Sequence, residues 1–403
     1  MADVTADPTP SAPVVGPVGR MQPWWYLGPV ERQALGIWLV SKLSLFVIAF
    51  SGPHLFALDD SGTNGPLERW ETWDFAHFDQ VARHGYFAPW RAPVEAFFPG
   101  LPLLMRAGLD IGVTTVVTGL FVSTVATAVA VVALARLAEL EYGRAAAQTT
   151  VIVWLAAPVA FFLSAPYTES PFLAFAIPAW LAARRDRWLT ACLLAAGACV
   201  FRVSAVFLIA ALGIQFLTTR NWRSGTLDAV IRIPFFLIPL VPLGLYMAYL
   251  HAHTGDWLRW YHAQAEGWYR QFTPPWTALD HTWQAAHGVM GFGSGTAQST
   301  IDEYAWMFAA EIVAVVIGLV ATVLLLVRRR WGEATWVGLQ VVSLATSYWF
   351  FSVPRTSLLW WPMWMMLGAW AARRRWVLYG YLAISLPLLG IWTSAYLTYR
   401  WAG

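Results

Sequence analysis

Charge is scarce in this sequence, and lysine and cysteine are nearly absent. Asp, Glu, Lys and Arg make up 12% of the 403 residues, against roughly 25% in soluble domains, and 58% of the residues are hydrophobic. This composition argues against a soluble domain and predicts an integral membrane protein. The net charge is only +3, and the basic residues, of which Lys42 is the only lysine, lie in short clusters, so a nucleic-acid-binding surface is not expected. The two cysteines, Cys192 and Cys199, share one apolar run, which argues against a disulfide framework and a CxxC metal site.

Several motifs are absent as well. The sequence contains no GxGxxG or GxxxxGKS/T motif and no internal repeat of fixed period, so nothing in it supports nucleotide binding. Residues 1–30 are rich in Pro, Ala and Gly and lack the short apolar core of a cleavable signal peptide. We therefore expect residues 1–31 to be a disordered cytoplasmic tail.

Apolar runs make up most of the remaining chain. They recur at about 32–52, 112–135, 146–163, 169–183, 188–201, 203–218, 229–250, 305–327, 334–350, 357–371 and 376–396. Several of these runs are shorter than the roughly 20 residues that a straight transmembrane helix needs. The pattern predicts an all-α polytopic membrane protein with about eleven transmembrane helices, in which residues 32–403 form a single domain.

Arginine clusters indicate the orientation in the membrane. If the N-terminal tail is cytoplasmic, the segments "ARRDRW", "TTRNWRS", "RRRW" and "ARRRW" all fall on the cytoplasmic side, as the positive-inside rule requires. Two long polar segments, residues 53–111 and 251–304, then face outward, together with the turns "SAPYTES" and "FSVPRTS". We therefore expect a multi-pass protein of the cell membrane whose polar chemistry lies on the extracytoplasmic side. The spans carry almost no charge, which argues against a transporter that alternates access.

The most polar stretch is "ERWETWDFAHFDQVARHGYF", residues 68–87. If it is helical, one face carries, at helical spacing, Trp70, Trp73, Asp74, His77, Val81 and His84. Aromatic rings stack on a pyranose, and a carboxylate beside an apolar wall can remove a proton from a hydroxyl group, so this face suits a sugar site. An amphipathic helix lying flat in the membrane interface has the same composition, and the stretch alone leaves both interpretations open.

A second polar turn, "FFLSAPYTESPFLAF", places Tyr167, Thr168 and Glu169 between two apolar runs. An acid in the first turn of a helix also complements the helix dipole, so Glu169 alone does not identify a site. Between the two polar segments, "FFPGLPLL" at residues 97–104 returns the first outward segment to the membrane.

Taken in order, the motifs "WDFAHFDQVARHGY", "FFPGLPLL", "SAPYTESPF" and "FRVSAV" resemble those of PIG-V-type mannosyltransferases, members of the GT-C superfamily. They extend from Trp73 to about Val206, and "YHAQAEGWYRQFTPPW" and "FSVPRTSLLWWP" echo the family more weakly. The resemblance implies a GT-C-like fold with a helical first outward loop. It also implies a glycosyltransferase that takes a hexose, usually mannose, from polyprenyl-phosphate mannose on the extracytoplasmic face. The expected partners are membrane lipids and a glycolipid or lipoglycan acceptor.

Individual residues match the family's motifs. The tryptophan–aspartate pair of the first outward loop corresponds to Trp73 and Asp74, the histidine that follows corresponds to His77, and the acid of the second outward turn corresponds to Glu169. In the late motif, family members usually have a tyrosine after Pro-Arg, where this chain has Thr356.

The donor chemistry implied by the resemblance suits an inverting displacement. Asp74 takes the proton from an acceptor hydroxyl whose oxygen attacks the anomeric carbon, while His77 and Glu169 orient the base or bind sugar hydroxyls. Glu169 and Asp79 remain alternatives for the base. The other substrate-binding candidates in these motifs are Trp73, Asp79 and Tyr167.

A lipid phosphate leaving group needs positive charge and hydrogen-bond donors rather than a cofactor or a divalent metal. Arg202 and Arg355 are the candidates for this role. An internal salt bridge to an outer-loop acid, or snorkelling to the lipid headgroups, is the alternative for Arg202, and binding of ordinary lipid headgroups is the alternative for Arg355. The segment "HAHTGD", with His251, His253 and Asp256, lies at the end of a span where polar residues mark the interface, so no metal site is expected there.

Other functions remain open at this point. A transporter or flippase of lipid-linked sugars also needs an outward site and a phosphate-binding arginine, but it needs no catalytic carboxylate. A non-catalytic scaffold of cell-envelope synthesis with the same fold is a third possibility, and a polyprenyl-phosphate-pentose donor is not excluded. Neither the acceptor nor the linkage formed follows from the sequence.

Overall fold

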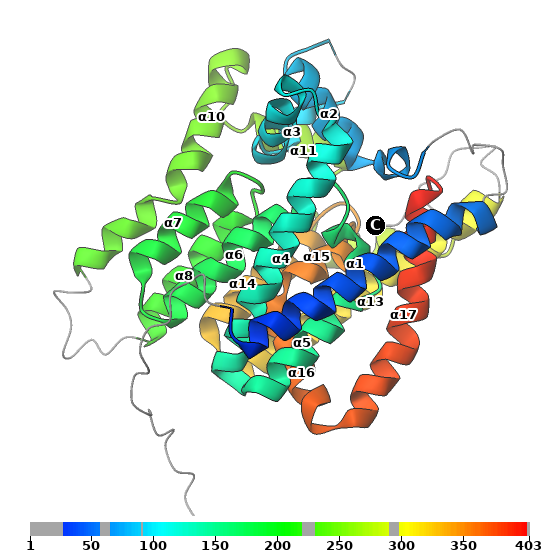
Figure 1. Cartoon of the computed structure of the whole chain (residues 1–403). Helices are drawn as coiled ribbons and strands as arrows, with labels where there is room; N and C mark the ends of the chain where they lie inside the picture. The colour runs from blue at the N-terminus through cyan, green and yellow to red at the C-terminus, as the bar shows by residue number, and fades with distance from the viewer. Residues whose placement is uncertain (1–26, 57–64, 90–91, 220–229, 290–297, 401–403) are drawn as a thin grey trace, which may run out of the picture.

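The computed structural model describes residues 27–56, 65–89, 92–219, 230–289 and 298–400, and every regular element within these ranges is helical. Sixteen α-helices in these ranges are joined by short turns and 3-10 segments (Figure 1). The all-α fold class predicted from the apolar runs is confirmed. Residues 1–26, most of the expected N-terminal tail, lie outside the described residues.

The helices follow the apolar pattern of the sequence. Those of the first half are α1 (Pro29–Phe56), α2 (Asp74–His84), α3 (Gly100–Asp110), α4 (Thr115–Tyr142), α5 (Arg144–Leu155), α6 (Glu169–Arg184), α7 (Trp188–Cys199) and α8 (Ala205–Thr219). Those of the second half are α10 (Leu240–Thr254), α11 (Arg259–Trp268), α12 (Pro275–Ala286), α13 (Gln298–Val327), α14 (Trp331–Ala345), α15 (Val353–Thr356), α16 (Trp361–Arg373) and α17 (Arg375–Leu397). Ten of the eleven expected apolar runs fall mostly on one of these helices, whereas only residues 240–250 of the run 229–250 lie on α10.

Five segments among the described residues are long and apolar enough to cross a membrane. They are Pro29–Ser51, Thr115–Tyr142, Val230–Thr254, Tyr304–Val327 and Arg375–Leu397. Two shorter apolar helices, α7 and α8, accompany them. The protein is therefore a multi-pass membrane protein. The total of about eleven crossings stays a prediction, because a helix such as α6, with 16 residues, extends about 24 Å, less than the roughly 30 Å of hydrocarbon in a bilayer.

Helix α6 lies in the middle of the assembly. Its sequence "ESPFLAFAIPAWLAAR" has apolar residues on every side, as expected of a helix that is surrounded by other helices. Helices α4, α7 and α8 pack against it, while α5 packs against α16 and α14 packs against α8. Small residues, mostly alanines, line many of these contacts and let the helix backbones approach closely. The central position of α6 gives its N-terminal residue, Glu169, a fixed and buried place.

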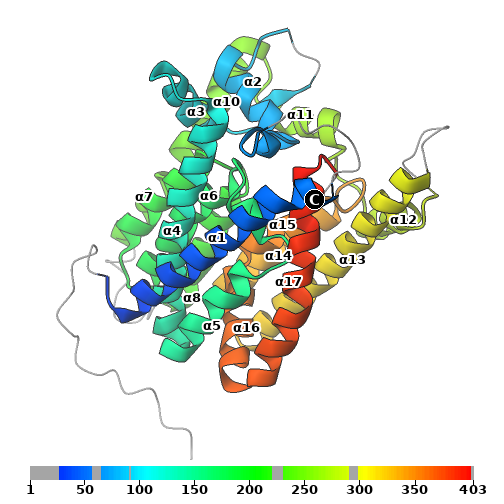
Figure 2. The same cartoon turned by 45° about the vertical axis from the view of Figure 1, so that its right-hand side comes forward.

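Helices α2, α3 and α11 gather at one end of the assembly, and the turn between α16 and α17 lies at the opposite end (Figures 1 and 2). The first polar segment, residues 53–111, contains α2 and α3 and is therefore helical, as expected. At its return to the helix bundle, the N–H of Gly100 donates to the carbonyl oxygen of Val200 at 2.9 Å. A Cβ at Gly100 would lie 2.7 Å from the ring of Phe201, so only glycine permits this close approach. The contact docks the "FFPG" stretch onto the turn that carries Arg202.

Candidate active site

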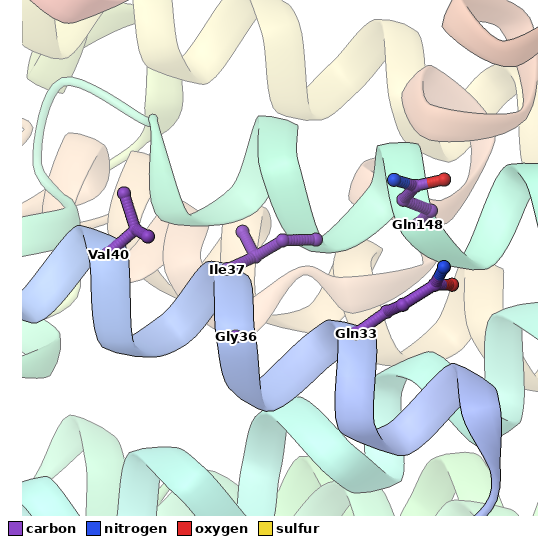
Figure 3. A pocket seen from close by; sticks show the side chains of 5 residues that line it. All are labelled: Gln33, Gly36, Ile37, Val40 and Gln148. Atoms are coloured by element: carbon purple, nitrogen blue, oxygen red, sulfur yellow. The ribbon is translucent and has the colours of Figure 1, made fainter.

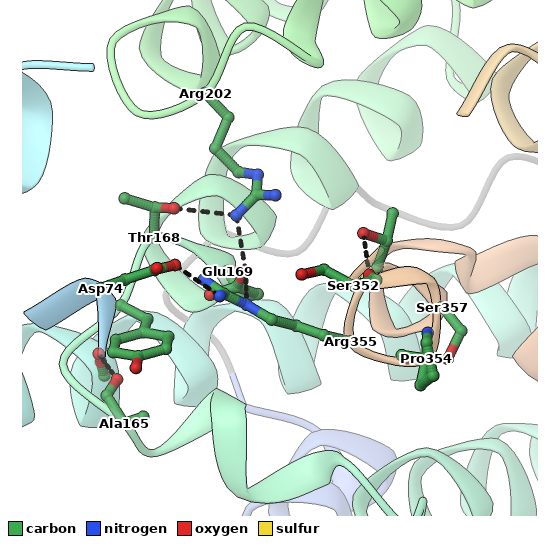
Figure 4. A network of polar contacts seen from close by, with 12 residues as sticks. Asp74, Ala165, Thr168, Glu169, Arg202, Ser352, Pro354, Arg355 and Ser357 are labelled. Atoms are coloured by element: carbon green, nitrogen blue, oxygen red, sulfur yellow. Dashed lines mark hydrogen bonds and ion pairs between the residues drawn. The ribbon is translucent and has the colours of Figure 1, made fainter. Parts of the chain in front are cut away.

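Four charged side chains from distant segments meet in one network (Figure 4). Arg355 donates from Nη1 to Asp74 Oδ2 at 2.6 Å and from Nε to Glu169 Oε1 at 2.6 Å. Arg202 donates from Nη1 to the same Glu169 oxygen at 2.6 Å and to Thr168 Oγ1 at 2.9 Å. We name Asp74, Glu169, Arg202 and Arg355 the outer network. Three of its members come from the motifs that carry the family resemblance, and Arg355 comes from the weaker late motif.

Asp74 is the first residue of α2. Its Oδ2 accepts the Arg355 bond, whereas its Oδ1 has no hydrogen bond to any described residue, and the side chain is 24% exposed. Trp73, immediately before it, has φ 54° and ψ −119°, a conformation that bulky residues rarely adopt. Such backbone strain persists only where the surrounding structure imposes it, and it is common at functional sites. The Trp73 side chain is itself exposed and therefore accessible to a ligand.

Glu169 is the first residue of α6 and has no exposed surface. Its Oε1 accepts from both arginines of the outer network, and its buried Oε2 has no hydrogen-bond partner among the described residues. A buried carboxylate is costly unless it is paired, and the two guanidinium groups supply that pairing. The unpaired Oε2 is a buried, unsatisfied acceptor of the kind that is rare in protein cores and more common at functional sites.

Arg355 also contacts two aromatic rings. Its Cζ lies 4.5 Å from the centroid of the Tyr167 ring and 4.9 Å from that of Phe162, which is the geometry of a cation–π interaction. The hydroxyl of Tyr167 donates to the carbonyl oxygen of Thr72 at 2.8 Å. Tyr167 thus fixes the guanidinium through its ring and the segment before Asp74 through its hydroxyl group.

The short helix α15, which carries Arg355, is held from a distant helix. Ser352, before α15, adopts the left-handed conformation with φ 62°. The carboxylate of Glu311, in α13, accepts from the backbone N–H groups of Ser352 and Val353 at 2.7 Å each. Thr356 occupies the position of the family's tyrosine and donates to the carbonyl oxygen of Ser352 at 2.7 Å. Glu311 therefore caps α15 from outside and positions the arginine that α15 presents.

The pKa values of Asp74 and His77 are both lowered, for different reasons. Burial alone raises the pKa of the Asp74 carboxyl, but the charge of Arg355 and its hydrogen bond outweigh burial and hold the pKa below its usual value. Burial lowers the pKa of His77, against the attraction of Asp74. The His77 ring stacks on Phe97 at 5.0 Å and meets the edge of Trp268 at 5.4 Å, and its buried Nδ1 has no partner among the described residues. Asp74 is thus a carboxylate and His77 a neutral ring at neutral pH.

Seven of the eight predicted site residues lie in or beside the outer network, and Asp79 does not. The Asp79 carboxylate accepts from Arg83 at 2.7 Å and from Thr115 of α4. These bonds connect α2 to α4. No described residue of the outer network bonds to Asp79, and its role at the substrate stays a prediction.

Arg202 forms the internal ion pair that the sequence left as its alternative role. Its Nη1 is occupied by Glu169 and Thr168, whereas its Nε and Nη2 have no hydrogen bond to any described residue. The guanidinium therefore keeps donors available for an anionic ligand, because the planar fork presents five N–H groups.

Two charged residues at the site, Glu311 and Arg270, were not among the predicted ones. Glu311 had a recognisable signal, since an acid within the apolar run 305–327 is rare and usually functional. Arg270 lies in "YHAQAEGWYRQFTPPW", where the resemblance is weak and no spacing singles out one arginine. Its nearness to Asp74, Arg202 and Arg355 is a property of the folded chain.

The polar residues of the segment "HAHTGD" have separate partners. His251 stacks on Trp257 at 4.3 Å, His253 Nδ1 lies 2.8 Å from a backbone oxygen, and Asp256 pairs with His262 at 2.6 Å. In the part of the chain that the structure describes, no group of three His, Cys, Asp or Glu residues is arranged to hold a metal ion.

A cavity of about 350 Å³ lies between α1 and α5 (Figure 3). It is lined by Gln33, Gly36, Ile37, Val40 and Gln148. None of these residues is charged and none belongs to the outer network, so we assign the cavity no part in the chemistry.

Comparison with known protein families gives a match to the first half of the chain. Residues 48–224 match the model of a family described as mannosyltransferase (PIG-V), a range that contains Asp74, Glu169 and Arg202. No curated protein and no solved structure matches the chain. The resemblance noted in the sequence motifs is thereby confirmed. Residues 48–224 thus match the PIG-V mannosyltransferase family, and this match implies glycosyltransferase activity.

Proposed function

We propose that this protein transfers mannose from polyprenyl-phosphate mannose to a glycolipid or other lipid-linked acceptor, by an inverting displacement on the extracytoplasmic face of the membrane. The family match supports the sugar, and the outer network supports the chemistry. The observation that carries the proposal is the geometry of Asp74, a carboxylate with one oxygen held by Arg355 and the other open at the start of α2.

Asp74 is the best placed of the three candidate bases. Glu169 is fully buried and shares its Oε1 between two arginines, and Asp79 is occupied by Arg83 and a threonine hydroxyl. The Oδ1 of Asp74 has no such partner among the described residues. Because its pKa is lowered, the Asp74 carboxylate takes the proton of the acceptor hydroxyl late in the reaction. By then, formation of the new glycosidic bond has made that hydroxyl group more acidic.

The reaction balances with these residues alone. The acceptor oxygen forms a bond to the anomeric carbon, the bond from that carbon to the phosphate oxygen breaks, and its electron pair leaves with the lipid phosphate. The acceptor proton passes to Asp74 Oδ1. The free Nε and Nη2 donors of Arg202 stabilise the charge that develops on the departing phosphate, and Trp73 offers a ring for the sugar to stack on.

A direct assay tests the proposal. Membranes that contain the wild-type protein are expected to transfer radiolabelled mannose from polyprenyl-phosphate mannose. Membranes that contain the Asp74→Asn variant at the same protein level are expected to transfer none. Asp110→Asn is the matched control, because it changes an exposed acid of α3 that pairs with Arg106 outside the outer network. Unchanged transfer in both Asp74→Asn and Glu169→Gln would contradict the catalytic assignment. Movement of the lipid-linked sugar across the membrane by a wild-type protein that transfers no sugar would instead identify a flippase.

The proposed reaction does not depend on a divalent metal. A polyprenyl-phosphate leaving group carries no pyrophosphate to neutralise, and arginine side chains can take that role. Transfer is therefore expected to survive EDTA. If chelation abolished transfer and Mg²⁺ or Mn²⁺ restored it, the acids of the site would have to be reinterpreted as metal ligands.

The side of the membrane can be tested by cysteine labelling. Both native cysteines are buried, so an introduced cysteine reports alone. Ile111→Cys, in the exposed turn between α3 and α4, is expected to react with an impermeant reagent in intact cells. Arg329→Cys, in the turn between α13 and α14, is expected to react only after the membrane is opened. The reverse pattern would contradict the proposed extracytoplasmic site.

A further inference from the structure

Arg270 is a third guanidinium group at the outer network, and it differs from the other two in having no carboxylate partner. Among the described residues it forms no ion pair, and its one hydrogen bond, from Nη2 to the carbonyl oxygen of Phe351, is long at 3.4 Å. By contrast, Arg202 pairs with Glu169, and Arg355 pairs with Glu169 and Asp74.

Among the described residues, no carboxylate contacts this cation. Asp74 and Glu169 are engaged by Arg202 and Arg355. Glu311 and Asp74 attract Arg270 from a distance only, and both oxygens of Glu311 accept from the backbone of α15. Burial, followed by the charge of Arg202, lowers the pKa of Arg270 to about 10. An enclosed guanidinium group close to other arginines destabilises the folded protein until an anion pairs with it.

Contacts on both sides hold the Arg270 segment against the catalytic residues. Trp268, two residues earlier, meets the His77 ring edge-on at 5.4 Å. Tyr269 ends α11 in the left-handed conformation common at helix ends, and its carbonyl oxygen accepts from the N–H of Tyr348 at 3.2 Å. The N–H of Thr273 donates to the carbonyl oxygen of Thr346 at 2.7 Å. The segment is thus joined to α2 and to the chain that leads into Arg355.

We propose that Arg270 binds the phosphate group of the lipid-linked sugar donor and of the lipid phosphate released from it. The assignment rests on the proposed function. The donor is a phosphodiester with one negative charge, and cleavage of its bond to the anomeric carbon leaves a phosphomonoester with a second charge while the acceptor proton moves to Asp74. An arginine without an internal partner gains most from that change, because its charge is not already satisfied by a carboxylate. Arg355 holds the acids in place, Arg202 offers its remaining Nε and Nη2 donors to the phosphate, and Arg270 adds a guanidinium group that no carboxylate of the described residues occupies.

The sugar-free product, polyprenyl phosphate, is the probe that tests Arg270 independently of turnover. Its equilibrium binding is measured on the full-length protein in nanodiscs for the wild type, Arg270→Gln, Arg270→Ala and Arg270→Lys. Loss of a charge-assisted contact is expected to weaken binding about 10- to 100-fold in Arg270→Gln, and Arg270→Lys is expected to restore part of it. Arg106→Gln is the matched control, because Arg106 lies on the same side but pairs with Asp110 at the surface of α3. The control is expected to bind like the wild type.

The outcomes separate this proposal from the proposed function. Equal binding by the wild type and a folded Arg270→Gln or Arg270→Ala protein would overturn the assignment of Arg270, even if the protein transfers mannose. Arg270-dependent binding by a protein that transfers no sugar would uphold the phosphate site and reject the transferase. Equally strong, Arg270-dependent binding of phosphatidylglycerol would identify an ordinary lipid headgroup as the ligand and overturn the donor assignment.

Discussion

Two clusters of enclosed acids and arginines lie at opposite ends of α6, and they are built differently. The outer network begins at Glu169, the first residue of this helix. The inner cluster, defined as Glu141, Arg184, Arg330 and Glu333, includes the last residue of the helix. In the inner cluster, Arg330 bonds to both Glu141 and Glu333, and Arg184 lies 3.2 Å from Glu141. These bonds join the ends of α4, α6 and α14.

The difference between the clusters indicates their roles. The inner cluster has two acids and two bases, and each acid is paired with an arginine of a neighbouring turn. Each cluster contains one buried carboxylate oxygen without a hydrogen bond, on Glu141 and on Glu169, but that of Glu141 lies 3.2 Å from Arg184. Only the outer network also has an open oxygen on Asp74 and, beside it in Arg270, a guanidinium group without a carboxylate partner among the described residues. Unsatisfied polar atoms of this kind are costly for stability and useful for binding. We therefore expect the inner cluster to stabilise the fold and the outer network to perform the chemistry.

The largest expected effect is on catalysis at the outer network. Asp74→Asn keeps the shape of the side chain but removes its basicity, so single-turnover transfer is expected to fall about 10²–10⁴-fold while donor binding stays nearly intact. Single-turnover assays and donor binding on the purified variant measure the two quantities. Wild-type transfer in Asp74→Asn together with a dead Glu169→Gln would move the base to Glu169 and leave the enzyme class in place.

A substitution in the inner cluster is expected to lower the stability of the fold and to leave the transfer rate unchanged. Arg330→Met removes the partner of two buried acids, so the free energy of unfolding is expected to fall by about 3–5 kcal/mol. Mannose transfer per folded molecule is expected to remain at the wild-type rate. Denaturant unfolding in detergent and a transfer assay on the folded fraction test the two parts. A loss of transfer as large as that of Asp74→Asn would break the distinction between the clusters.

Substitutions of Arg202 test whether this residue both binds the donor phosphate and holds the outer network together. Arg202→Ala is expected to weaken donor binding by roughly 1.5–3 kcal/mol, because a charge-assisted contact to the phosphate is lost, and to slow transfer further. Arg202→Lys is expected to rescue only part of the loss, since the ammonium group lacks the planar fork. Donor titration of the three proteins checks this order. Unchanged donor binding in Arg202→Ala would show that Arg202 only holds Glu169.

Glu311 is expected to act on the site indirectly. Glu311→Gln replaces one acceptor oxygen by an amide NH₂ group, so one backbone N–H of Ser352 or Val353 loses its partner. The expected cost is about 1–3 kcal/mol of folding free energy, with a lower turnover number and a nearly unchanged KM for the donor. Thermal unfolding and steady-state kinetics measure both. A changed KM with a normal turnover number would instead indicate contact with the donor.

The smallest expected effect is the change in transfer rate when the pH is lowered slightly. The pKa values of Asp74 and His77 are both lowered, so each group stays in its deprotonated form at any pH above its shifted pKa. Transfer is therefore expected to change less than about twofold between pH 8 and pH 6.5, with the loss beginning only at more acidic pH, since unperturbed His titrates near 6.5 and Asp near 3.9. A pH–rate profile of the wild type is sufficient. Half-maximal transfer near pH 7 would contradict these shifts.

Much of the fold could be predicted because apolar runs are a local property of the sequence. The helical nature of α1, α4, α13 and α17 follows directly from their length and composition. The number of membrane crossings does not follow in the same way. Short helices such as α6 are buried by the helices that pack around them, and a local stretch of sequence does not specify which helices these are.

The site was predictable to the extent that its residues lie in local motifs. Asp74, Glu169 and Arg202 stand in stretches with distinctive composition, and so they could be identified without a structure. The bond from Arg355 to Asp74 joins residues 281 positions apart, and no local pattern specifies such a pairing. Arg270 is similar, because its lack of an acid partner is visible only once the chain is folded.

The sharing of Glu169 Oε1 between two arginines also bears on how this protein can evolve. Arg355 is bonded to two acids and Glu169 to two arginines, so loss of Arg355 leaves Asp74 without its arginine and loss of Glu169 leaves Arg202 without its acid. Loss of Asp74 or Arg202, by contrast, leaves every other member of the outer network paired. Among related sequences, we therefore expect Glu169 and Arg355 to tolerate the least change on structural grounds, whereas Arg106 and Asp110 are free to vary as an exposed pair.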